Sequence, residues 1–346
     1  DDGERSLLFL YRNSGKRGIT LDYTQPVGRD ILLRLAATAD VLYESFEPGY
    51  LASLGLGYGD LSAANPRLIV VSITPFGQDG PMAHWKTSPI VSFAMSGAMT
   101  MSGWPGKEPC DAPHPMAYDS AATYATVAVM MALWSRHTTD RGQHIDVSVQ
   151  EAGIGGLYPW AVPTYSYGGM GPTIPALATR GGVVATLYEC QDGYVRMTAV
   201  TDRHWLALIT ALGNPEELAA AEWQDAAFRA ANADVVHELI SQHTRLYGME
   251  EFMTLAQSHG VPIAAVRPPS GFTRDPNTRI RGYWTEVDHP VAGAAEYPGM
   301  PLKMSRSTLP PLAPAPLLGQ HNDEIYAGDL ALTQPELARL RASGAI

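Results

Sequence analysis

The segment from Arg67 to Thr74, RLIVVSIT, constrains the fold most strongly, because its apolar residues run on without alternating. A run of this kind is typical of a strand that is covered on both faces, as in a parallel sheet. Extended segments over Gly18–Tyr23 and Asp40–Glu44 enclose a helix expected over residues 28–39. This strand–helix–strand order is the unit of a parallel sheet covered by helices. The sequence therefore predicts an α/β fold.

A second apolar run, Ala121 to Trp134, follows Asp119 and has almost no polar face, so it predicts a buried helix. Asp is a strong N-cap residue because its carboxylate accepts backbone N–H groups that the first turn leaves unpaired. A short strand, His144 to Val149, is expected after the helix. The Asp119 carboxylate has two interpretations, a cap or a nucleophile or base in a cleft. The residues alone favour the cap.

The second half of the chain differs from the first in its amino-acid pattern. Gly, Pro and Tyr dominate residues 154–182, which indicates a linker or an active-site loop. Two strand-like segments then flank Gln191-Asp192-Gly193, a hairpin turn signal, and several helical segments follow. We expect a large domain over 1–160 and 304–346, a linker over 161–177 and a smaller α+β domain over 178–303.

Composition excludes several classes of protein. The formal net charge of −11 argues against a nucleic-acid partner, which needs a basic patch. No apolar run is long enough to span a bilayer, so no membrane partner is expected. The two cysteines and ten histidines form no spaced metal set, and a reducing, cytoplasmic setting is the default. Because the chain starts with Asp and not Met, we expect that its natural N-terminus is missing.

Several phrases, taken together, resemble the family III CoA-transferases (the CaiB/BaiF family), which include formyl-CoA transferase, carnitine CoA-transferase and α-methylacyl-CoA racemase. The matching phrases are RNSGKRGITLDY, ADVLYESFEPGYLASLGLGY, NPRLIVVSITPFGQDGP, SGAM, the Asp119 helix with RGQHIDVSVQEA, YECQDGYV, GVPIAAV and PLLGQHNDEIY. They occur in the family's order and cover nearly the whole chain. Each phrase alone is weak evidence for the family, but the complete set is specific for it.

The resemblance implies a fold and an assembly. Family members have a large Rossmann-like domain built from both ends of the chain, with a small domain inserted between them. Two protomers thread through each other, so an interlocked homodimer is expected. We expect that the family's opening strand and helix, which supply an arginine of the CoA site, are missing from the given chain.

The resemblance also implies a mechanism in which Asp119 is the nucleophile. Its carboxylate would attack an acyl-CoA and form an aspartyl anhydride, then an aspartyl-CoA thioester, before a carboxylic acid acceptor takes the CoA. The substrates would be an acyl-CoA and a carboxylic acid. Coenzyme A would enter as a thioester substrate, and no cofactor would be bound permanently.

The family's CoA contacts match three stretches of this chain. They are Leu21, Asp22, Tyr23 and Thr24; Ser45, Phe46 and Glu47; and Lys86. Lys16 and Arg17 are added on charge alone, and Ser53 replaces an arginine common in the family. For Leu21 and Phe46, core packing is an equally good interpretation. A glycine-rich loop over the acyl intermediate would be formed by Gly168, Gly169 and Gly171.

Two other functions remain open. The racemase branch pairs its aspartate with a histidine before the SGAM phrase, and here only His84 lies nearby, out of register. The racemase's small-domain glutamate is not evident in Thr198–Asp202 either, so transfer is favoured over an acyl-CoA racemase or isomerase. The third possibility is a non-catalytic CoA-binding half of a larger protein, against which the intact Asp119 argues.

Overall fold

The computed structural model describes residues 6–103, 107–157 and 184–346. These residues fall into two compact units. The first lies within Asp1–Ser96, His114–Pro159 and Arg274–Ile346, and the second within Gly97–Pro113 and Trp160–Thr273. The linker expected over 161–177 lies outside the described residues, and the predicted domain boundaries stay a prediction.

A parallel sheet forms the centre of the first unit. Its strands are β1 (Val41–Glu44), β2 (Ile69–Thr74) and β3 (His144–Ser148), in the order β1-β2-β3. Val41 pairs with Ile69, and Val70 pairs with His144. The predicted α/β fold with a parallel sheet is therefore confirmed.

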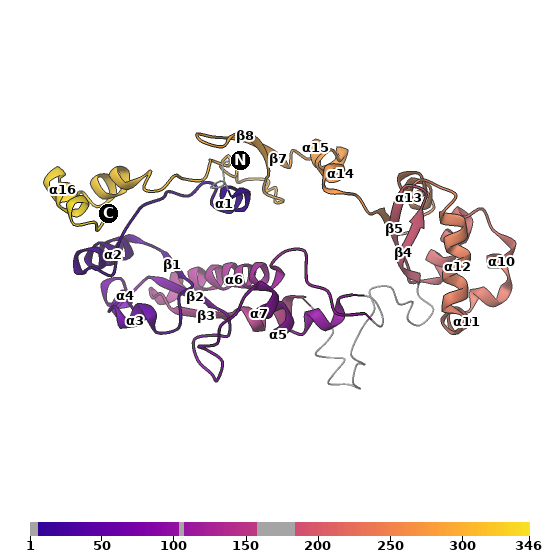
Figure 1. The fold of residues 1–346 in the computed structure, drawn as a ribbon, viewed down its shortest axis with the longest axis horizontal. Helices are drawn as coiled ribbons and strands as arrows, with labels where there is room; N and C mark the ends of the chain where they lie inside the picture. The colour runs from indigo at the N-terminus through magenta and orange to yellow at the C-terminus, as the bar shows by residue number, and fades with distance from the viewer. Residues whose placement is uncertain (1–5, 104–106, 158–183) are drawn as a thin grey trace. The chain divides into compact units, whose positions relative to one another are not determined.

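Helices cover both faces of β2, which explains its continuous apolar sequence. On one face Ile69 and Val71 pack against helix α6 (Met116–Thr139), which runs beside β2 and β3 in Figure 1. On the other face Leu68 and Val70 pack against helices α2 (Pro26–Thr38) and α4 (Tyr58–Ala64). Helices α3 (Tyr50–Ser53), α5 (Pro89–Met95) and α7 (Val149–Leu157) complete this part of the unit.

Helix α6 differs from its prediction in two ways. It begins at Met116 with Pro115 as the N-cap residue, so Asp119 lies inside the first turn and is not the cap. Proline suits this end of a helix because its missing N–H costs no hydrogen bond there. The helix is also buried on one face only, because the sheet covers a single side of it. Its outer face exposes large apolar side chains: Tyr124, Val127, Met130, Met131 and Trp134.

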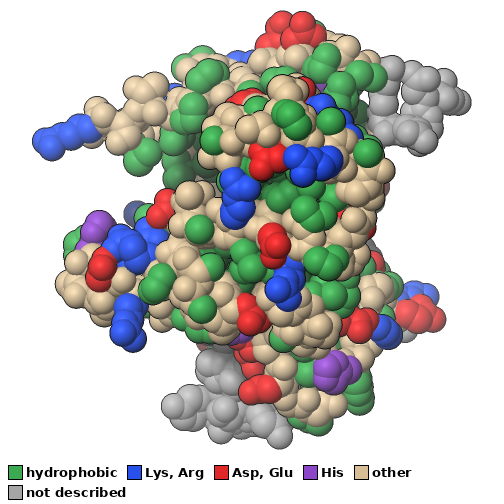
Figure 2. All heavy atoms as spheres, turned by 90° about the vertical axis from the view of Figure 1, so that its left-hand side faces the viewer, with side chains coloured by type: hydrophobic (Ala, Val, Ile, Leu, Met, Phe, Trp, Pro, Cys, Tyr) green, Lys and Arg blue, Asp and Glu red, His purple; other side chains and the backbone are tan. Residues whose placement is uncertain are grey.

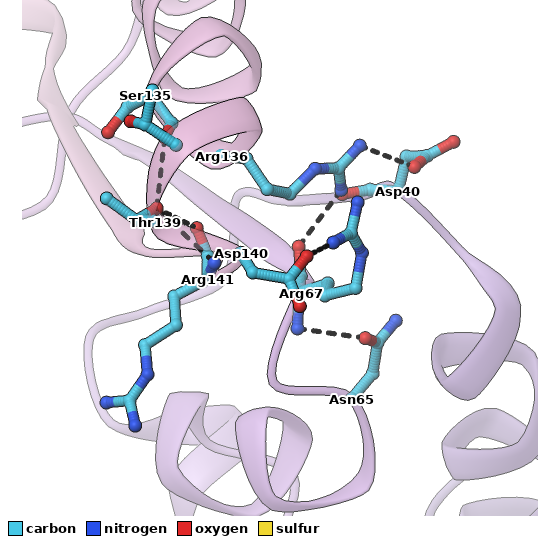
Figure 3. Close-up of polar contacts among 9 residues, drawn as sticks. Asp40, Asn65, Arg67, Ser135, Arg136, Thr139, Asp140 and Arg141 are labelled. Atoms are coloured by element: carbon cyan, nitrogen blue, oxygen red, sulfur yellow. Dashed lines mark hydrogen bonds and ion pairs between the residues drawn. The ribbon is translucent and has the colours of Figure 1, made fainter.

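The C-terminal end of α6 is tied to the first strands by side chains, as Figure 3 shows. Arg136 donates to the carbonyl of Arg67 at 3.0 Å and to the carboxylate of Asp40 at 2.7 Å. Arg67 in turn forms an ion pair with Asp140, the C-cap residue in the left-handed conformation. Gly142 then passes so close to the start of β2 that a Cβ there would lie 1.9 Å from the Leu68 carbonyl oxygen. The corner therefore fixes where α6 ends and β3 begins.

The segment from Gly18 to Tyr23 was predicted as a strand, and this prediction is wrong. A helix not expected from the sequence, α1 (Leu7–Arg12), precedes it, and the segment itself pairs with no strand of the described sheets. Its backbone is bonded by side chains from far along the chain instead. Asn322 accepts from the Thr20 N–H at 3.0 Å, and the Tyr326 hydroxyl donates to the Thr20 carbonyl at 2.6 Å.

The rest of the first unit is built from elements that lie late in the chain. The hairpin β7 (Trp284–His289) and β8 (Gly293–Pro298) packs Val287 and Tyr297 against Leu10 of α1. A π-helix, η3 (Glu324–Asp329), and helix α16 (Gln334–Ala342) form a small core with Ile31 of α2. Helix α15 (Pro276–Ile280) precedes the hairpin.

The second unit has its own core around an antiparallel sheet. Strands β4 (Val184–Cys190) and β5 (Gly193–Ala199) form the hairpin predicted at Gln191-Asp192-Gly193, and β6 (Ile263–Ala265) pairs with β5. Trp205, Ile240 and Phe252 pack against this sheet. The helices of the unit are α9 (Asp202–Ala211), α10 (Glu216–Ala219), α11 (Ala226–Ala231), α12 (Ala233–Thr244), α13 (Met249–Ser258) and α14 (Pro269–Thr273).

Charged side chains of both signs are interspersed on the face drawn in Figure 2, with hydrophobic groups between them. This agrees with the ion pairs of the described residues, of which Arg17–Glu324 and Arg245–Glu189 are two. Among the helices of the described residues, none has the length and apolar character that a membrane span needs.

Candidate active site

Asp119 is placed by the close packing of α7 against the first turns of α6. A Cβ at Gly153 would lie 2.7 Å from the Cβ of Ser96, and a Cβ at Gly156 would lie 2.1 Å from the hydroxyl oxygen of Ser120. The Ser120 hydroxyl donates to the Ala152 carbonyl at 2.8 Å. Gly156 therefore lets α7 approach the beginning of α6, where Ser120 turns toward α7, whereas Gly153 lets α7 approach Ser96 at the end of α5. Asp119 turns elsewhere, and its side chain is 45% exposed.

Two basic side chains contact the Asp119 carboxylate, one at each oxygen. The guanidinium Nη2 of Arg12, the last residue of α1, lies 2.8 Å from Oδ1. The imidazole Nδ1 of His114 lies 3.2 Å from Oδ2. Asp119 is thus held by side chains and not by the N–H groups of its own helix.

These contacts contribute little to stability. Both partners of the Arg12–Asp119 pair are more than 40% exposed, and exposed pairs of this kind contribute about 0–1 kcal/mol. The carboxylate also lies in the first turn of α6, where the helix dipole stabilises negative charge. Asp119 therefore does not cap α6, because the N-cap residue is Pro115, and its role as a nucleophile stays a prediction.

Neither Arg12 nor His114 was singled out as a neighbour of Asp119. Arg12 was visible only as one cation of a basic stretch, 107 residues away in the sequence. His114 stands five residues before Asp119, directly before Pro115. Only the fold brings α1 to α6, so periodicity could not have found the first contact.

Phe46 belongs to an exposed aromatic cluster and not to the core. Its ring centroid lies 6.0 Å from that of Tyr23 and 5.2 Å from that of Tyr50. The Phe46 N–H donates to the Glu44 carboxylate at 2.7 Å, which fixes the turn after β1. The core interpretation of Phe46 is therefore wrong, because the ring is 39% exposed.

Glu47 and Lys86 lie together beside this cluster. The Lys86 ammonium donates a hydrogen bond to the Glu47 carboxylate, and this bond, with the charge of Lys86, lowers the pKa of Glu47. His84 lowers it further by its charge. Ser45 is exposed on the same turn. Neighbouring turns thus carry five of the predicted CoA contacts: Tyr23, Ser45, Phe46, Glu47 and Lys86.

The stretch from Leu21 to Thr24 has a structural role. Leu21 packs against the core of η3 and α16, as the packing interpretation proposed. Asp22 accepts from the Thr24 hydroxyl at 2.5 Å and from the Thr24 N–H at 3.0 Å, and these bonds lower the pKa of Asp22. The turn they form leads into α2.

The two cations added on charge alone differ. Arg17 bonds Glu324 and Asp329, each at 2.8 Å, and these bonds raise its pKa. Lys16 donates to Asn13 at 3.0 Å and lines a cavity of ≈ 700 Å³ with Phe9 and His289. Both side chains line this cavity, but Arg17 is engaged by two carboxylates, whereas Lys16 donates to a neutral amide.

The structure does not join all predicted residues into one site. Within the described residues, no hydrogen bond or ion pair connects Asp119 to Tyr23, Phe46 or Lys86. Gly168, Gly169 and Gly171 lie outside the described residues. The described part of the chain also contains no group of three or more His, Cys, Asp or Glu residues that could hold a metal ion.

The fold and site define a class: an α/β protein that presents an exposed carboxylate between an arginine and a histidine side chain. Comparison with known proteins gives the family. The family model described as CoA-transferase family III matches residues 1–322. The chain therefore belongs to the family III CoA-transferases, which are enzymes of class EC 2.8.3.

Individual relatives agree with this assignment. The chain is 31% identical over 333 residues to the succinyl-CoA:(R)-benzylsuccinate CoA-transferase subunit BbsE of Thauera aromatica, covering 93% of this chain and 80% of the relative. It is 28% identical over 357 residues to the formyl-CoA:oxalate CoA-transferase of Streptomyces avermitilis, with coverage of 99% and 87%. The crystal structure of a CaiB/BaiF family protein from Brucella suis matches with a TM-score of 0.82 and 28% identity, over 94% of this chain and 85% of that one.

Proposed function

We propose that this enzyme moves CoA from an acyl-CoA to a carboxylic acid through a covalent intermediate on Asp119. The Asp119 carboxylate attacks the carbonyl carbon of the thioester, forming an anhydride and releasing CoA thiolate. The thiolate attacks the aspartyl carbonyl, which gives an aspartyl-CoA thioester and frees the first acid. The acceptor acid then attacks this thioester, and the returning thiolate takes the new acyl group. Each step converts one activated acyl group, a thioester or an anhydride, into another of similar free energy. No single step therefore has a large barrier.

The observation that carries this proposal is the exposed Asp119 carboxylate between Arg12 and His114, in a chain of this family. A thioester can reach a side chain that is 45% exposed. The cations and the N-terminal turn of α6 stabilise the carboxylate until substrate arrives. They can also stabilise negative charge that develops on the reacting carbonyl groups.

The CoA site is proposed at the turns that carry Tyr23, Phe46 and Lys86. The exposed ring of Phe46, with the partly buried ring of Tyr23 beside it, offers a surface on which an adenine can stack. The ammonium of Lys86 is exposed and suited to a phosphate, once it leaves Glu47. Lys16 is a further candidate for phosphate, and the two carboxylates on Arg17 argue against that residue.

An interlocked homodimer with a Rossmann-like large domain is part of the same proposal. The exposed apolar face of α6 supports it, since side chains such as Met131 and Trp134 are more than 60% exposed in one protomer. A glycine-rich loop of Gly168, Gly169 and Gly171 is proposed to cover the acyl intermediate. The cytoplasmic setting stays a prediction.

Intact mass spectrometry tests the reaction directly. The protein is mixed with succinyl-CoA or formyl-CoA, the donors that the relatives' names contain. We expect a CoA adduct that hydroxylamine removes and that maps to Asp119. The variant Asp119→Ala should form none. An adduct on another residue, or one that persists in Asp119→Ala, would exclude Asp119 as the nucleophile.

The racemase alternative needs two bases on opposite sides of an α-carbon. The only histidine in contact with Asp119 within the described residues is His114, and its Nδ1 lies 3.2 Å from the carboxylate. This separation leaves no room for a carbon atom between them. Solvent deuterium entering the α-carbon of an acyl-CoA, without any CoA adduct, would nevertheless favour the racemase.

A further inference from the structure

The two oxygens of Asp119 are held differently, and this difference assigns them separate tasks. Arg12 Nη2 lies 2.8 Å from Oδ1, and His114 Nδ1 lies 3.2 Å from Oδ2. We propose that Arg12 is a catalytic residue that stays on Oδ1 and stabilises the oxyanion formed there, while Oδ2 attacks the acyl donor. This inference rests on the proposed function and adds a second residue to its chemistry.

The strengths of the two contacts support this assignment of the two oxygens. A guanidinium is always charged, and its hydrogen bond to a carboxylate at 2.8 Å is of the strong, charge-assisted kind. An imidazole carries a charge only when it is protonated, and its contact is longer. A hydrogen bond to the attacking oxygen lowers its nucleophilicity and weakens as the bond to carbon forms. Less free energy is lost when Oδ2 leaves His114 than when Oδ1 leaves Arg12.

The oxyanion on Oδ1 arises when the aspartyl carbonyl itself is attacked. In the anhydride, Oδ2 is the bridging atom and Oδ1 is the carbonyl oxygen of Asp119. The CoA thiolate forms a bond to Cγ, and the π electron pair moves onto Oδ1. Collapse restores the carbonyl and breaks the Cγ–Oδ2 bond, whose electron pair leaves with the first acid. When the acceptor acid attacks the aspartyl thioester, the same charge forms on Oδ1, and CoA thiolate is the leaving group.

Arg12 can be replaced without removing the helix that carries it. Helix α1 is anchored by Leu10, which is buried against Val287 and Tyr297. Its ends are held by hydrogen bonds of Ser6 and Ser14 to the backbone of Phe9 and Leu10. The Arg12 side chain itself is 43% exposed. A substitution at Arg12 should therefore change the chemistry and leave the fold in place.

The experiment compares Arg12→Gln with His114→Gln, a matched change at the other oxygen of the same carboxylate. The aspartyl-CoA adduct is formed with succinyl-CoA and freed of excess donor. Succinate is then added, and the loss of the adduct is followed by quenched mass spectrometry. Loss of one oxyanion donor slows a reaction by roughly 100-fold or more, so this is the effect expected for Arg12→Gln. His114→Gln should stay within about threefold of the wild type, because Oδ2 left with the first acid when the thioester formed.

A spectroscopic readout separates this role from a merely structural one. The infrared stretch of the aspartyl thioester carbonyl should rise in Arg12→Gln, because a hydrogen bond to Oδ1 from a charged donor is lost. Arg12→Lys keeps a cationic donor and should recover part of the rate. A rate in Arg12→Lys no better than in Arg12→Gln would count against an oxyanion contact.

The outcomes distinguish this inference from the function on which it rests. An adduct on Asp119 that is discharged at the wild-type rate in Arg12→Gln would overturn the role of Arg12 and leave the proposed function intact. Slowing in His114→Gln as large as in Arg12→Gln would overturn the assignment of the two oxygens. Absence of any adduct in the wild type would reject the proposed function and this inference together.

Discussion

Replacing Arg136 by Met tests whether the corner drawn in Figure 3 holds α6 to the sheet. Only 11% of the Arg136 side chain is exposed, and its guanidinium donates to the Arg67 carbonyl at 3.0 Å. A hydrogen bond from a charged donor contributes about 1.5–3 kcal/mol to stability. The ion pair with Asp40, whose side chain is 77% exposed, adds at most about 1 kcal/mol. Met keeps the apolar stem of the side chain, so the free energy of unfolding should fall by about 2–3 kcal/mol.

Arg67 provides the matched control, since it lies at the same corner. Its guanidinium pairs with Asp140, but the two side chains are 51% and 81% exposed. Such a pair contributes about 0–1 kcal/mol. Arg67→Met should therefore cost much less than Arg136→Met, although both remove one positive charge.

Amide hydrogen exchange measures the loss of stability in the two variants at the corner itself. The Ile69 N–H donates to the Asp40 carbonyl, and the Val70 N–H donates to the Gln143 carbonyl, so both report the opening of the sheet at this corner. Their protection should fall strongly in Arg136→Met and little in Arg67→Met. Equal losses in the two variants would refute the argument that burial and bonds to backbone carbonyls, and not charge, make Arg136 important.

Two further predictions concern buried groups. Burial raises the pKa of Cys190 to about 11 from an ordinary 9.0, so its contribution to stability is full below pH 9.0 and is lost as the pH rises through about 11. Iodoacetamide should accordingly modify the exposed Cys110 in the folded protein and reach Cys190 only on unfolding; equal labelling rates would contradict this. Tyr326→Phe removes the hydroxyl that donates to the Thr20 carbonyl at 2.6 Å, and should cost about 1–2 kcal/mol. Faster amide exchange around Thr20 would show this loss, and unchanged exchange there would contradict it.

Much of the sheet could be predicted because its signals are local. The run from Arg67 to Thr74 is apolar since both of its faces are covered, and the structure places β2 there as the middle strand. The turn at Gln191-Asp192-Gly193 marks its hairpin by residue type alone. Each of these elements is specified by residues within one short window.

The errors come from contacts that no short window contains. Gly18–Tyr23 is extended, but the groups that bond its backbone are the side chains of Asn322 and Tyr326, so it needs no neighbouring strand. The start of α6 was placed too late, because Asp119 was favoured as the N-cap residue, whereas the helix begins at Met116 after Pro115.

The candidate site was predicted only in part for the same reason. Asp119 came from a resemblance to a family, whereas Arg12 and His114 came only from the fold. The contact of Arg12 with Asp119 depends on where α1 packs, and Leu10 is buried against a hairpin almost 280 residues away. Sequence patterns indicate which residues are buried, but not which distant segments they meet.

The hydrogen bonds between Thr20 and the side chains of Asn322 and Tyr326 have a consequence for how the chain folds during synthesis. The two partners are 302 and 306 residues away from Thr20. A ribosome that adds about 5–20 residues per second needs roughly 15–60 s to cover this distance. Throughout that interval the backbone around Thr20 must bond water or a chaperone. The first unit can therefore reach its native state only after translation has passed Tyr326, even though the strands of its parallel sheet emerge much earlier.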